Sequence, residues 1–388
     1  MGFISAGWIA RIPAVTAKLD LDPAQLGILL LFIAVGSLTA FQSIGRWIEQ
    51  YGSDRTTYLF SIFYVCAFIA MALAPNAWVL GLALFLYGFG FGATDVAMNA
   101  QGVTVERRLA KSIMGSLHGY YSLGALIGAA ISAGLAGFDA GLETNLLSFA
   151  AIGLVLAVWA NRGQVKDEPI VSVPGERKRR GFQLPPRALW TLGVVAFCGA
   201  VGEGSVGDWG PLYVHDELGA SEGTAAFAFT AFSTTMLLAR FATDRVTTIV
   251  KPSVAVRYGG ILAVIGLVGG ALPGNTTAAI IGFAVMGFGL APVFPLVYSA
   301  AGSIPGIPSG RGVAAAATMG YTGFLAGPPL LGFVARATSI QTSLLIVAAL
   351  LVAIPFTASS LDQATQVGHV EPVSPADVSP TASVDTGA

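Results

Sequence analysis

The chain has 388 residues, of which 54% are hydrophobic and only 11% are charged, and its mean hydropathy is +0.73. Soluble domains carry about 25% charged residues, so this composition excludes a soluble globular protein and predicts that most of the chain lies in a lipid bilayer. The net charge of −1 creates no field that would attract nucleic acid. With three histidines, two cysteines, no P-loop and no paired CxxC motif, we expect no metal, no cofactor, no nucleic-acid partner and no enzymatic activity.

The first apolar stretch, residues 1–15, is short for a membrane-spanning helix. It ends in AGWIARIPAV, which resembles GDWGPLYV in the second half of the chain and pairs Trp8 with Trp209. About 20 residues of apolar helix precede Trp209, whereas seven residues precede Trp8. We therefore expect the first helix to be truncated at its N-terminus, or its start site to be misplaced.

The next helix begins at Asp22-Pro23, because aspartate is a favoured N-cap and proline is favoured at the first helical position. Further apolar runs of membrane-spanning length follow along the chain. The sequence therefore predicts an all-α integral membrane protein with 12 transmembrane helices. In order, the predicted helices are about residues 1–15, 23–47, 57–74, 78–104, 113–137, 144–159, 187–214, 222–243, 253–272, 276–303, 311–336 and 340–359.

A charged, proline-bearing segment divides these helices into two sets of six. Residues 161–186 contain KDEPIVSVPGERKRRGFQLPP, which we interpret as a cytoplasmic linker. It separates a first six-helix bundle, residues 1–160, from a second, residues 187–360. Residues 361–388 are polar, acidic and rich in Ser, Thr, Pro and Ala, so we expect a disordered tail.

The distribution of positive charge predicts the orientation in the membrane. When both termini are placed in the cytoplasm, all but three of the 20 Lys and Arg residues lie on the cytoplasmic side, the exceptions being Arg11, Lys18 and Arg336. Because cytoplasmic loops are enriched in Lys and Arg, we expect a multi-pass protein of the cytoplasmic membrane with both ends inside.

The stretch YGFGFGATDVAMNAQG, residues 87–102, combines glycines with polar residues inside an apolar run. Gly88, Gly92, Asp95 and Asn99 are spaced i, i+4, i+7 and i+11, so they share one helix face. A carboxylate in the middle of a membrane costs about 2.5–3.5 kcal/mol, so Asp95 should face protein or water. We interpret Asp95 and Asn99 as a substrate or proton site, or alternatively as a structural pair that binds a neighbouring helix.

The stretch MGFGLAPVFPLVYSAAG, residues 286–302, repeats the GFG core, with Gly287 following Gly88 at an offset of 199. The same offset aligns Gly124 of GALIGA with Gly323 of GFLAGP. A recurrence in register half a chain apart indicates two similar bundles, with a substrate path between them lined by polar residues of the midplane.

A second intramembrane acid, Glu203, lies in GAVGEGSVGDWG, where glycines weaken a regular helix. Irregular backbone at membrane depth is tolerated where it lines a cavity, so Glu203 is a candidate for solute binding or proton coupling. Asp208 lies five residues further on and closer to the outer end. We interpret it as a gate or interface contact.

Five further residues have two interpretations each. His118 is either a hydrogen-bonded residue near a helix end or a proton relay that gates transport. Tyr121 is either a packing aromatic or a residue that stacks on a sugar-sized solute. Trp8 and Trp209 belong either to the interfacial aromatic belt or to the lining of the outer cavity. Arg11 either extends its side chain outward to the membrane surface, or it binds an anionic solute or Asp208 across the cavity.

The arrangement of 6+6 helices with a long basic central loop resembles the major facilitator superfamily. The loop signature of that family is matched by ARFATDR at residues 239–245 and degraded in GRWIEQYGSDR, where Glu49 takes the acidic place. The resemblance implies that Arg240, Asp244, Arg245 and Glu49 are gating charges at the cytoplasmic ends of helices, where they lock one conformation. Contact with the substrate is the alternative interpretation of Arg240, Asp244 and Arg245.

Three stretches, WIARIPAV, ATDVAMNAQG with the LHGYYSLGALIGA that follows, and GEGSVGDWGPLYV, resemble the fucose:proton symporter-like branch of that superfamily. In this branch the acid of the fourth helix is implicated in sugar binding or proton coupling, which implies such a role for Asp95. The fucose carriers also use an acid in the first helix. Here that helix has none, which shifts a proton role toward Glu203.

The sequence thus predicts a secondary active transporter that moves a small polar solute by alternating access, with protons as the coupling ion and Asp95 and Glu203 as the residues that carry them. We expect it to act as a monomer in the lipid bilayer. A drug or metabolite exporter and a non-transporting membrane sensor with the same fold are the alternatives.

Overall fold

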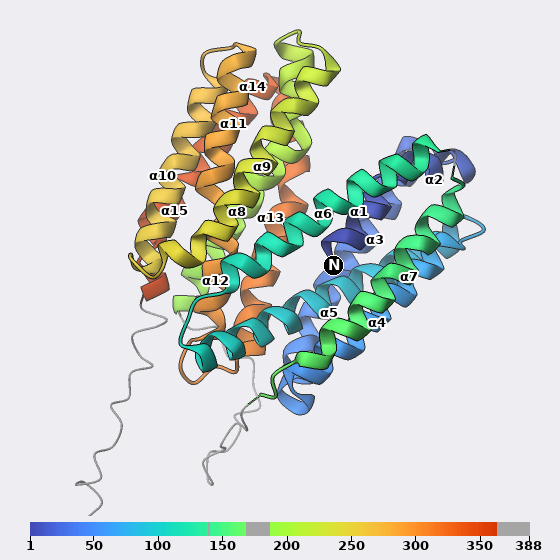
Figure 1. Cartoon of the computed structure of the whole chain (residues 1–388). Helices are drawn as coiled ribbons and strands as arrows, with labels where there is room; N and C mark the ends of the chain where they lie inside the picture. Colours follow the sequence, from blue (N-terminus) through green and yellow to red (C-terminus); the bar gives the residue numbers. More distant parts are fainter. Residues whose placement is uncertain (139, 168–186, 363–388) are drawn as a thin grey trace, which may run out of the picture.

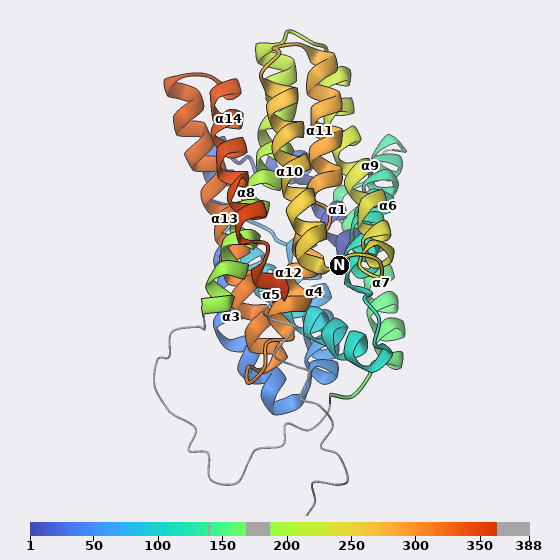
Figure 2. The same cartoon turned by 90° about the vertical axis from the view of Figure 1, so that its left-hand side faces the viewer.

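The computed structural model describes residues 1–138, 140–167 and 187–362, and these residues form helices and connecting turns without a β-strand. Two helical bundles stand side by side (Figures 1 and 2). In Figure 1 the bundles meet at their lower ends, near α5 and α12, and diverge toward the opposite end. Most of the predicted linker and nearly all of the predicted tail lie outside the described residues.

Five of the six helices predicted in the first bundle are found with their ends shifted by a few residues, and the helix predicted over residues 1–15 is divided at Ala10 and Arg11. The capping box predicted at Asp22 is formed, because the Gln25 backbone N–H donates to the Asp22 carboxylate at 2.8 Å and the Asp22 N–H donates to the Gln25 side chain at 3.0 Å. Asn76 caps the helix that starts at Ala77, since its side-chain oxygen accepts from the Val79 backbone N–H at 3.0 Å. The helices are α1 (Gly2–Ile9), α2 (Ile12–Lys18), α3 (Pro23–Tyr51), α4 (Ser53–Ala72), α5 (Ala77–Leu109), α6 (Met114–Gly137) and α7 (Leu142–Ala160).

Two of the helices predicted as continuous in the second bundle are interrupted. The helix predicted over residues 276–303 breaks at Ala291 and Pro292, since Pro292 has no N–H to donate to the preceding turn. The helix predicted over residues 340–359 breaks at Val352. The helices are α8 (Arg187–Leu212), α9 (Glu222–Val246), α10 (Pro252–Ala271), α11 (Thr276–Leu290), α12 (Val293–Gly302), α13 (Ser309–Ala337), α14 (Ile340–Leu351) and α15 (Ala353–Thr357), and a π-turn, Tyr213–Glu217, follows α8.

Ten helical segments in the described part of the chain are long and apolar enough to cross a membrane. The short α1 and the 29-residue α13 are not among them. An all-helical, multi-pass membrane fold is therefore confirmed, while the count of twelve spans and the truncation of the first helix stay predictions.

The predicted internal repeat is visible in how the glycines pack. A Cβ atom on Gly88 of α5 would lie 2.1 Å from the carbonyl oxygen of Ile33 in α3. A Cβ atom on Gly287 of α11 would lie 2.3 Å from the carbonyl oxygen of Phe232 in α9. Gly287 lies 199 residues after Gly88, and Phe232 lies 199 residues after Ile33, so both contact residues are related by the repeat offset. The two glycines therefore allow the same close helix contact in the two bundles, as the sequence predicts.

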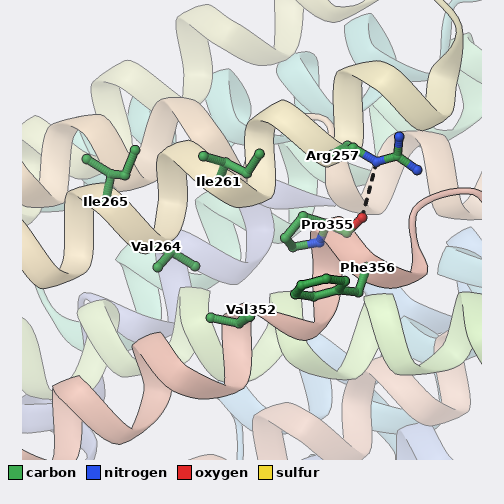
Figure 3. Close-up of a pocket in the computed structure, with 7 residues that line it drawn as sticks. All are labelled: Arg257, Ile261, Val264, Ile265, Val352, Pro355 and Phe356. Atoms are coloured by element: carbon green, nitrogen blue, oxygen red, sulfur yellow. Dashed lines mark hydrogen bonds between the residues drawn. The ribbon is translucent and has the colours of Figure 1, made fainter.

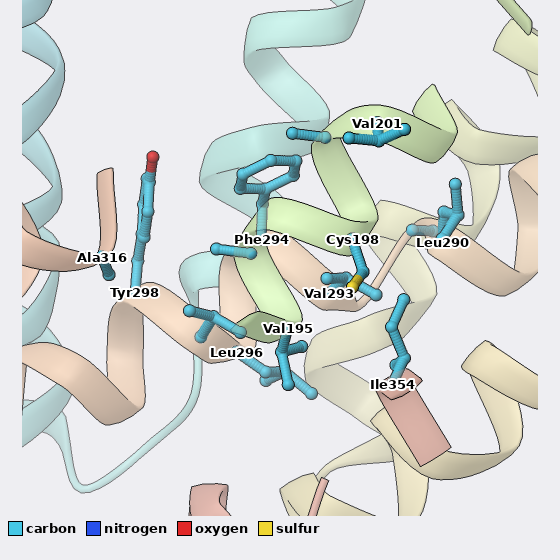
Figure 4. Packing of buried hydrophobic residues seen from close by; sticks show 14 of the residues in the cluster. Val195, Cys198, Val201, Leu290, Val293, Phe294, Leu296, Tyr298, Ala316 and Ile354 are labelled. Atoms are coloured by element: carbon cyan, nitrogen blue, oxygen red, sulfur yellow. The ribbon is translucent and has the colours of Figure 1, made fainter. Parts of the chain in front are cut away.

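The interruption between α11 and α12 packs against α8 in a dense apolar core (Figure 4). Val293 and Phe294, which start α12, lie beside Val195 and Cys198 of α8, and all four are buried. A Cβ atom on Gly199 would lie 2.8 Å from a methyl group of Val293, so this glycine makes room for the bent segment. The packing fixes the position of α12, which faces the first bundle at its lower end.

Candidate functional site

Asp95 lies at the interface between the two bundles and faces protein, as the cost of a carboxylate in lipid requires. Its side chain belongs to α5 of the first bundle, and the residue is 8% exposed. It accepts a hydrogen bond of 3.1 Å from the Asn99 amide and one of 3.3 Å from the hydroxyl of Tyr321 in α13 of the second bundle. Asp95 and Asn99 are therefore hydrogen-bonded to each other, and Asp95 is also bound by Tyr321 of the opposite half of the protein.

His118 extends this hydrogen-bonded group along α6. Because the Asn99 amide nitrogen donates to Asp95, its oxygen is left to accept, and it lies 3.2 Å from His118 Nε2. This requires the proton of a neutral imidazole to sit on Nε2. One turn later, the hydroxyl of Ser122 donates to the His118 carbonyl at 3.1 Å.

Arg240 of α9 connects Ser122 to the second intramembrane acid. Arg240 Nη1 donates to the Ser122 hydroxyl at 2.6 Å, and Nη2 lies 3.3 and 3.5 Å from the two carboxylate oxygens of Glu203 in α8. The Arg240 side chain is 8% exposed and the Glu203 side chain is 27% exposed. Arg240 Nε is buried with no hydrogen-bond partner in the described part of the chain. The guanidinium is therefore only partly paired, although it is nearly removed from solvent.

These contacts form one polar network that runs between the bundles. We call it the interface network; its members are Asp95, Asn99, His118, Ser122, Glu203, Arg240 and Tyr321. It contains two carboxyl groups and one guanidinium. When both carboxyls are ionised and the imidazole is neutral, its net charge is −1, and binding one proton makes it neutral.

Aromatic rings surround this network. The ring of Tyr321 lies edge-on to Phe41 of α3 with 4.8 Å between centroids, and Phe91 of α5 is 6.3 Å away. Tyr298 of α12, which is 2% exposed, has its ring 5.8 Å from that of His118. Such rings offer apolar faces beside the hydrogen-bonding groups.

Sequence reasoning missed Ser122, Tyr298 and Tyr321, although a signal for them exists. The repeat offset of 199 carries Asn99 onto Tyr298 and Ser122 onto Tyr321. Tyrosines in an apolar run are commonly packing residues, so Tyr298 and Tyr321 were not predicted as site residues.

Of the four residues predicted to be gating charges, Arg240 has its side-chain contacts with Ser122 and Glu203. Arg240 belongs to the interface network, and Asp244 lies one turn further along α9. Asp244 is 8% exposed and accepts two backbone hydrogen bonds at the start of α6, from Gly115 at 2.8 Å and Ser116 at 2.7 Å. A carboxylate is stabilised there by the free N–H groups and the dipole of the helix. Arg245 is exposed, and its side chain makes no hydrogen bond or ion pair within the described residues.

Three further contacts join the bundles at the end predicted to be cytoplasmic. Glu49 of α3 forms an ion pair with Arg311 of α13, in which Nη2 donates to the carboxylate at 2.8 Å. Arg107 donates to the Gly302 carbonyl at 2.7 Å. Ser299 donates to Glu106 at 2.5 Å, joining α12 to α5. Together with Asp244, these contacts close the lower end shown in Figure 1, where the bundles meet.

The remaining candidates lie outside the interface network. Trp8 is buried at 2% exposure, so it does not belong to a lipid-facing belt, and its indole N–H has no partner in the described part of the chain. Trp209 is half-buried against α13, with its indole N–H likewise unpaired. Arg11 donates to the Ala140 carbonyl at 3.3 Å, and among the described residues it makes no contact with Asp208, which is exposed.

Tyr121 is half-buried on α6, immediately before Ser122 of the network. A Cβ atom on Gly2 would lie 2.1 Å from the Tyr121 carbonyl oxygen, so the backbones of α1 and α6 touch at this point. The short first helix therefore packs beside the network without contributing a charged group to it.

The fold and this interface define a multi-pass helical membrane carrier made of two related halves. The family model described as Major Facilitator Superfamily matches residues 1–306, and the chain belongs to that family. The resemblance expected from the sequence is thereby confirmed, and the family consists of membrane transporters rather than enzymes.

The chain is similar over most of its length to three proteins described as transporters or membrane proteins. An uncharacterized transporter, y4wD, of Sinorhizobium fredii is 30% identical over 352 residues, which are 89% of this chain and 91% of that protein. An uncharacterized MFS-type transporter of Yersinia pestis is 29% identical over 93% of this chain and 92% of its own length. The membrane protein MosC of Rhizobium meliloti is 28% identical over 90% of this chain and 84% of its own length.

Solved structures share the fold at low sequence identity. The fucose:proton symporter FucP in its outward conformation has a TM-score of 0.77 at 16% identity, over 93% of this chain and 96% of that one. The human organic anion transporter MFSD10 has a TM-score of 0.70 at 16% identity, over 92% and 89% of the two chains. At this identity the likeness shows the fold alone.

Proposed function

We propose that this chain is a secondary active transporter that moves a small polar solute across the cytoplasmic membrane by alternating access, and that protons are the coupling ion. The observation that carries the proposal is the interface network, which holds buried charged groups from both halves in hydrogen-bonded contact. Residues at such an interface change partners when one half moves against the other, which is how binding on one side becomes release on the other.

Asp95 is the proton carrier in this proposal. When it is ionised, the network has a net charge of −1, and a buried net charge opposes any rearrangement that removes it from its hydrogen-bond donors. Taking up a proton makes the network neutral and lets Asp95 donate a hydrogen bond to a solute. Tyr321, which binds Asp95 from the other half, ties this step to the relative position of the halves.

Arg240 and Glu203 form the second part of the proposed binding site. The Arg240–Glu203 distances of 3.3 and 3.5 Å are long for a charge-assisted hydrogen bond, and one guanidinium nitrogen is unpaired. A solute oxygen that binds this guanidinium would complete its hydrogen bonds and loosen Glu203.

The residue types favour a sugar-like solute. Carboxyl, amide, hydroxyl and guanidinium groups can bind several hydroxyls, while the faces of Tyr321 and Phe41 suit the apolar side of a sugar ring. The two named fold neighbours, a fucose:proton symporter and an organic anion transporter, are compatible with a solute rich in oxygen.

The contacts at the predicted cytoplasmic end support alternating access. They join the halves through an ion pair, hydrogen bonds and helix capping, which can open without unfolding either bundle. With this end closed, the solute would enter from the outer side, where Asp208 and Trp209 stand as candidates for an outer gate. The positive-inside distribution supports cytoplasmic termini, and we propose a monomer as the working unit.

The test is the pH change in weakly buffered proteoliposomes when candidate sugars and related metabolites are added. We expect external alkalinisation with one solute, lost in Asp95→Asn and in Glu203→Gln. Glu143→Gln serves as the control, because Glu143 pairs with Lys18 at the surface, away from the network. Solute binding without proton movement, unchanged by both variants, would contradict the proposal and leave a facilitator or a sensor.

A further inference from the structure

The outer face of the second bundle carries a pocket of about 530 Å³ between α10 and the pair α14–α15 (Figure 3). One wall is formed by Ile261, Val264 and Ile265 of α10, and the other by Val352 and Phe356. Phe356 is 80% exposed and Ile265 is 58% exposed, so the pocket opens away from the protein. In a chain that spans a membrane, such a face meets lipid.

The local sequence explains why a groove forms here. Pro355 cannot donate a backbone hydrogen bond, and the last membrane helix is interrupted at Val352 just before it. A Cβ atom on Gly260 would lie 2.7 Å from Ile354 and 3.0 Å from Pro355, so the absence of a side chain at this glycine allows α15 to pack closely against α10. The groove lies along this contact, where the small side chain of Val264 faces Val352 (Figure 3).

Among the residues that line the groove, Arg257 is the one that carries a charge, and it lies at one end. Arg257 Nε donates to the Pro355 carbonyl at 3.2 Å, which fixes the guanidinium at this end (Figure 3). Its two terminal nitrogens make no hydrogen bond to any described residue, and Arg257 is exposed. They are free to bind an anion. On the adjoining chain segment, Asp362 accepts from the backbone and hydroxyl of Ser253 at 3.3 and 2.6 Å.

The spacing along α10 matches the depth of a phospholipid. Arg257 lies five residues after the start of α10 at Pro252, or about 7.5 Å along the helix. Ile261 and Ile265 follow on the same face, about 6 and 12 Å deeper. The orientation from the positive charges places the start of α10 at the cytoplasmic surface. Tyr258, adjacent to Arg257 and 63% exposed, is the kind of residue found at the level of lipid headgroups.

We propose that this groove binds an anionic phospholipid of the cytoplasmic leaflet. The lipid phosphate contacts the terminal nitrogens of Arg257, and one acyl chain lies along Ile261, Val264 and Ile265 against Val352 and Phe356. The charge of the guanidinium selects an anionic headgroup, and the apolar walls hold the chain. None of these residues belongs to the interface network, so this site stands independently of the transported solute.

The test is native mass spectrometry of the full-length protein released from nanodiscs that contain equal amounts of phosphatidylglycerol and phosphatidylethanolamine. We expect the parent to retain phosphatidylglycerol, and Arg257→Gln to retain at least fivefold less. Val352→Trp keeps the cation and fills the groove, so it should show the same loss. Arg55→Gln is the matched control: Arg55 is also an exposed arginine near the predicted cytoplasmic start of a helix, but it does not line this groove.

Equal melting temperatures of all variants in phosphatidylethanolamine alone show that the fold is intact. Undiminished retention by Arg257→Gln would overturn the proposal, and so would loss in Arg257→Gln without loss in Val352→Trp, which would mean that the groove holds no chain. Displacement of the lipid by millimolar glycerol phosphate would identify a free anion as the ligand and would also overturn it.

Discussion

Replacing Asp244 by alanine should shift the carrier toward the conformation that is open to the cytoplasm. Asp244 is buried and binds two backbone N–H groups at the start of α6, so it crosses from one bundle to the other. A hydrogen bond to a charged group contributes about 1.5–3 kcal/mol. Taking the lower value for both bonds gives about 3 kcal/mol, or about a 150-fold change in the ratio of the two conformations.

Distances between spin labels can measure this shift. Lys111 and Ile249 lie at the predicted cytoplasmic ends of opposite bundles, and cysteines at these positions can be labelled. The exposed Cys66 is first replaced by serine, whereas Cys198 is buried. In the parent we expect one short distance, and in Asp244→Ala a large added population at a longer distance.

Arg245→Ala is the control for this experiment, since Arg245 neighbours Asp244 but its side chain makes no hydrogen bond or ion pair among the described residues. It should leave the distance distribution unchanged. If Asp244→Ala also leaves it unchanged, the capping contact does not hold the cytoplasmic end closed, and the reasoning is refuted.

Three further predictions follow from individual contacts. Gly88→Val places a branched side chain against the backbone of α3 and should lower the melting temperature by several degrees, whereas Gly134→Ala, which has nothing within 4 Å, should change the free energy of unfolding by less than about 0.5 kcal/mol. Arg240→Lys keeps the charge but cannot make both of its contacts, so solute affinity measured by titration should fall at least tenfold; unchanged affinity would remove Arg240 from the binding site. Exchanging the charges of Glu49 and Arg311 should restore most of the thermal stability lost by either single change, and a double-mutant cycle should give a coupling of about 0.5–1 kcal/mol, because Arg311 is 56% exposed.

Much of the fold follows from patterns that are local in the sequence. Apolar run lengths, the Asp22-Pro23 helix start and the glycine stripe on α5 depend on neighbouring residues, so they predict helix positions and a close helix contact. The repeat offset predicts the corresponding contact in the other half. The break at Pro292 was missed because apolar composition continues across it, although proline itself was the available signal.

In the candidate site, the two acidic residues could be predicted from the sequence, but their partners could not. Asp95 and Glu203 stand out because a carboxyl inside a membrane segment is costly. That Arg240 binds Glu203 and Ser122, and that Tyr321 binds Asp95, depends on how two separate bundles are placed against each other. No pattern within one helix contains that information.

The coupling of solute to protons at Asp95 is the central claim, and transport by Asp95→Asn proteoliposomes tests it most directly. With equal pH on both sides, labelled solute should still exchange across the membrane through the variant, because the amide can replace the protonated carboxyl. With an imposed pH gradient, the parent should accumulate the solute and the variant should not. Accumulation by Asp95→Asn that still follows the pH gradient would contradict the account.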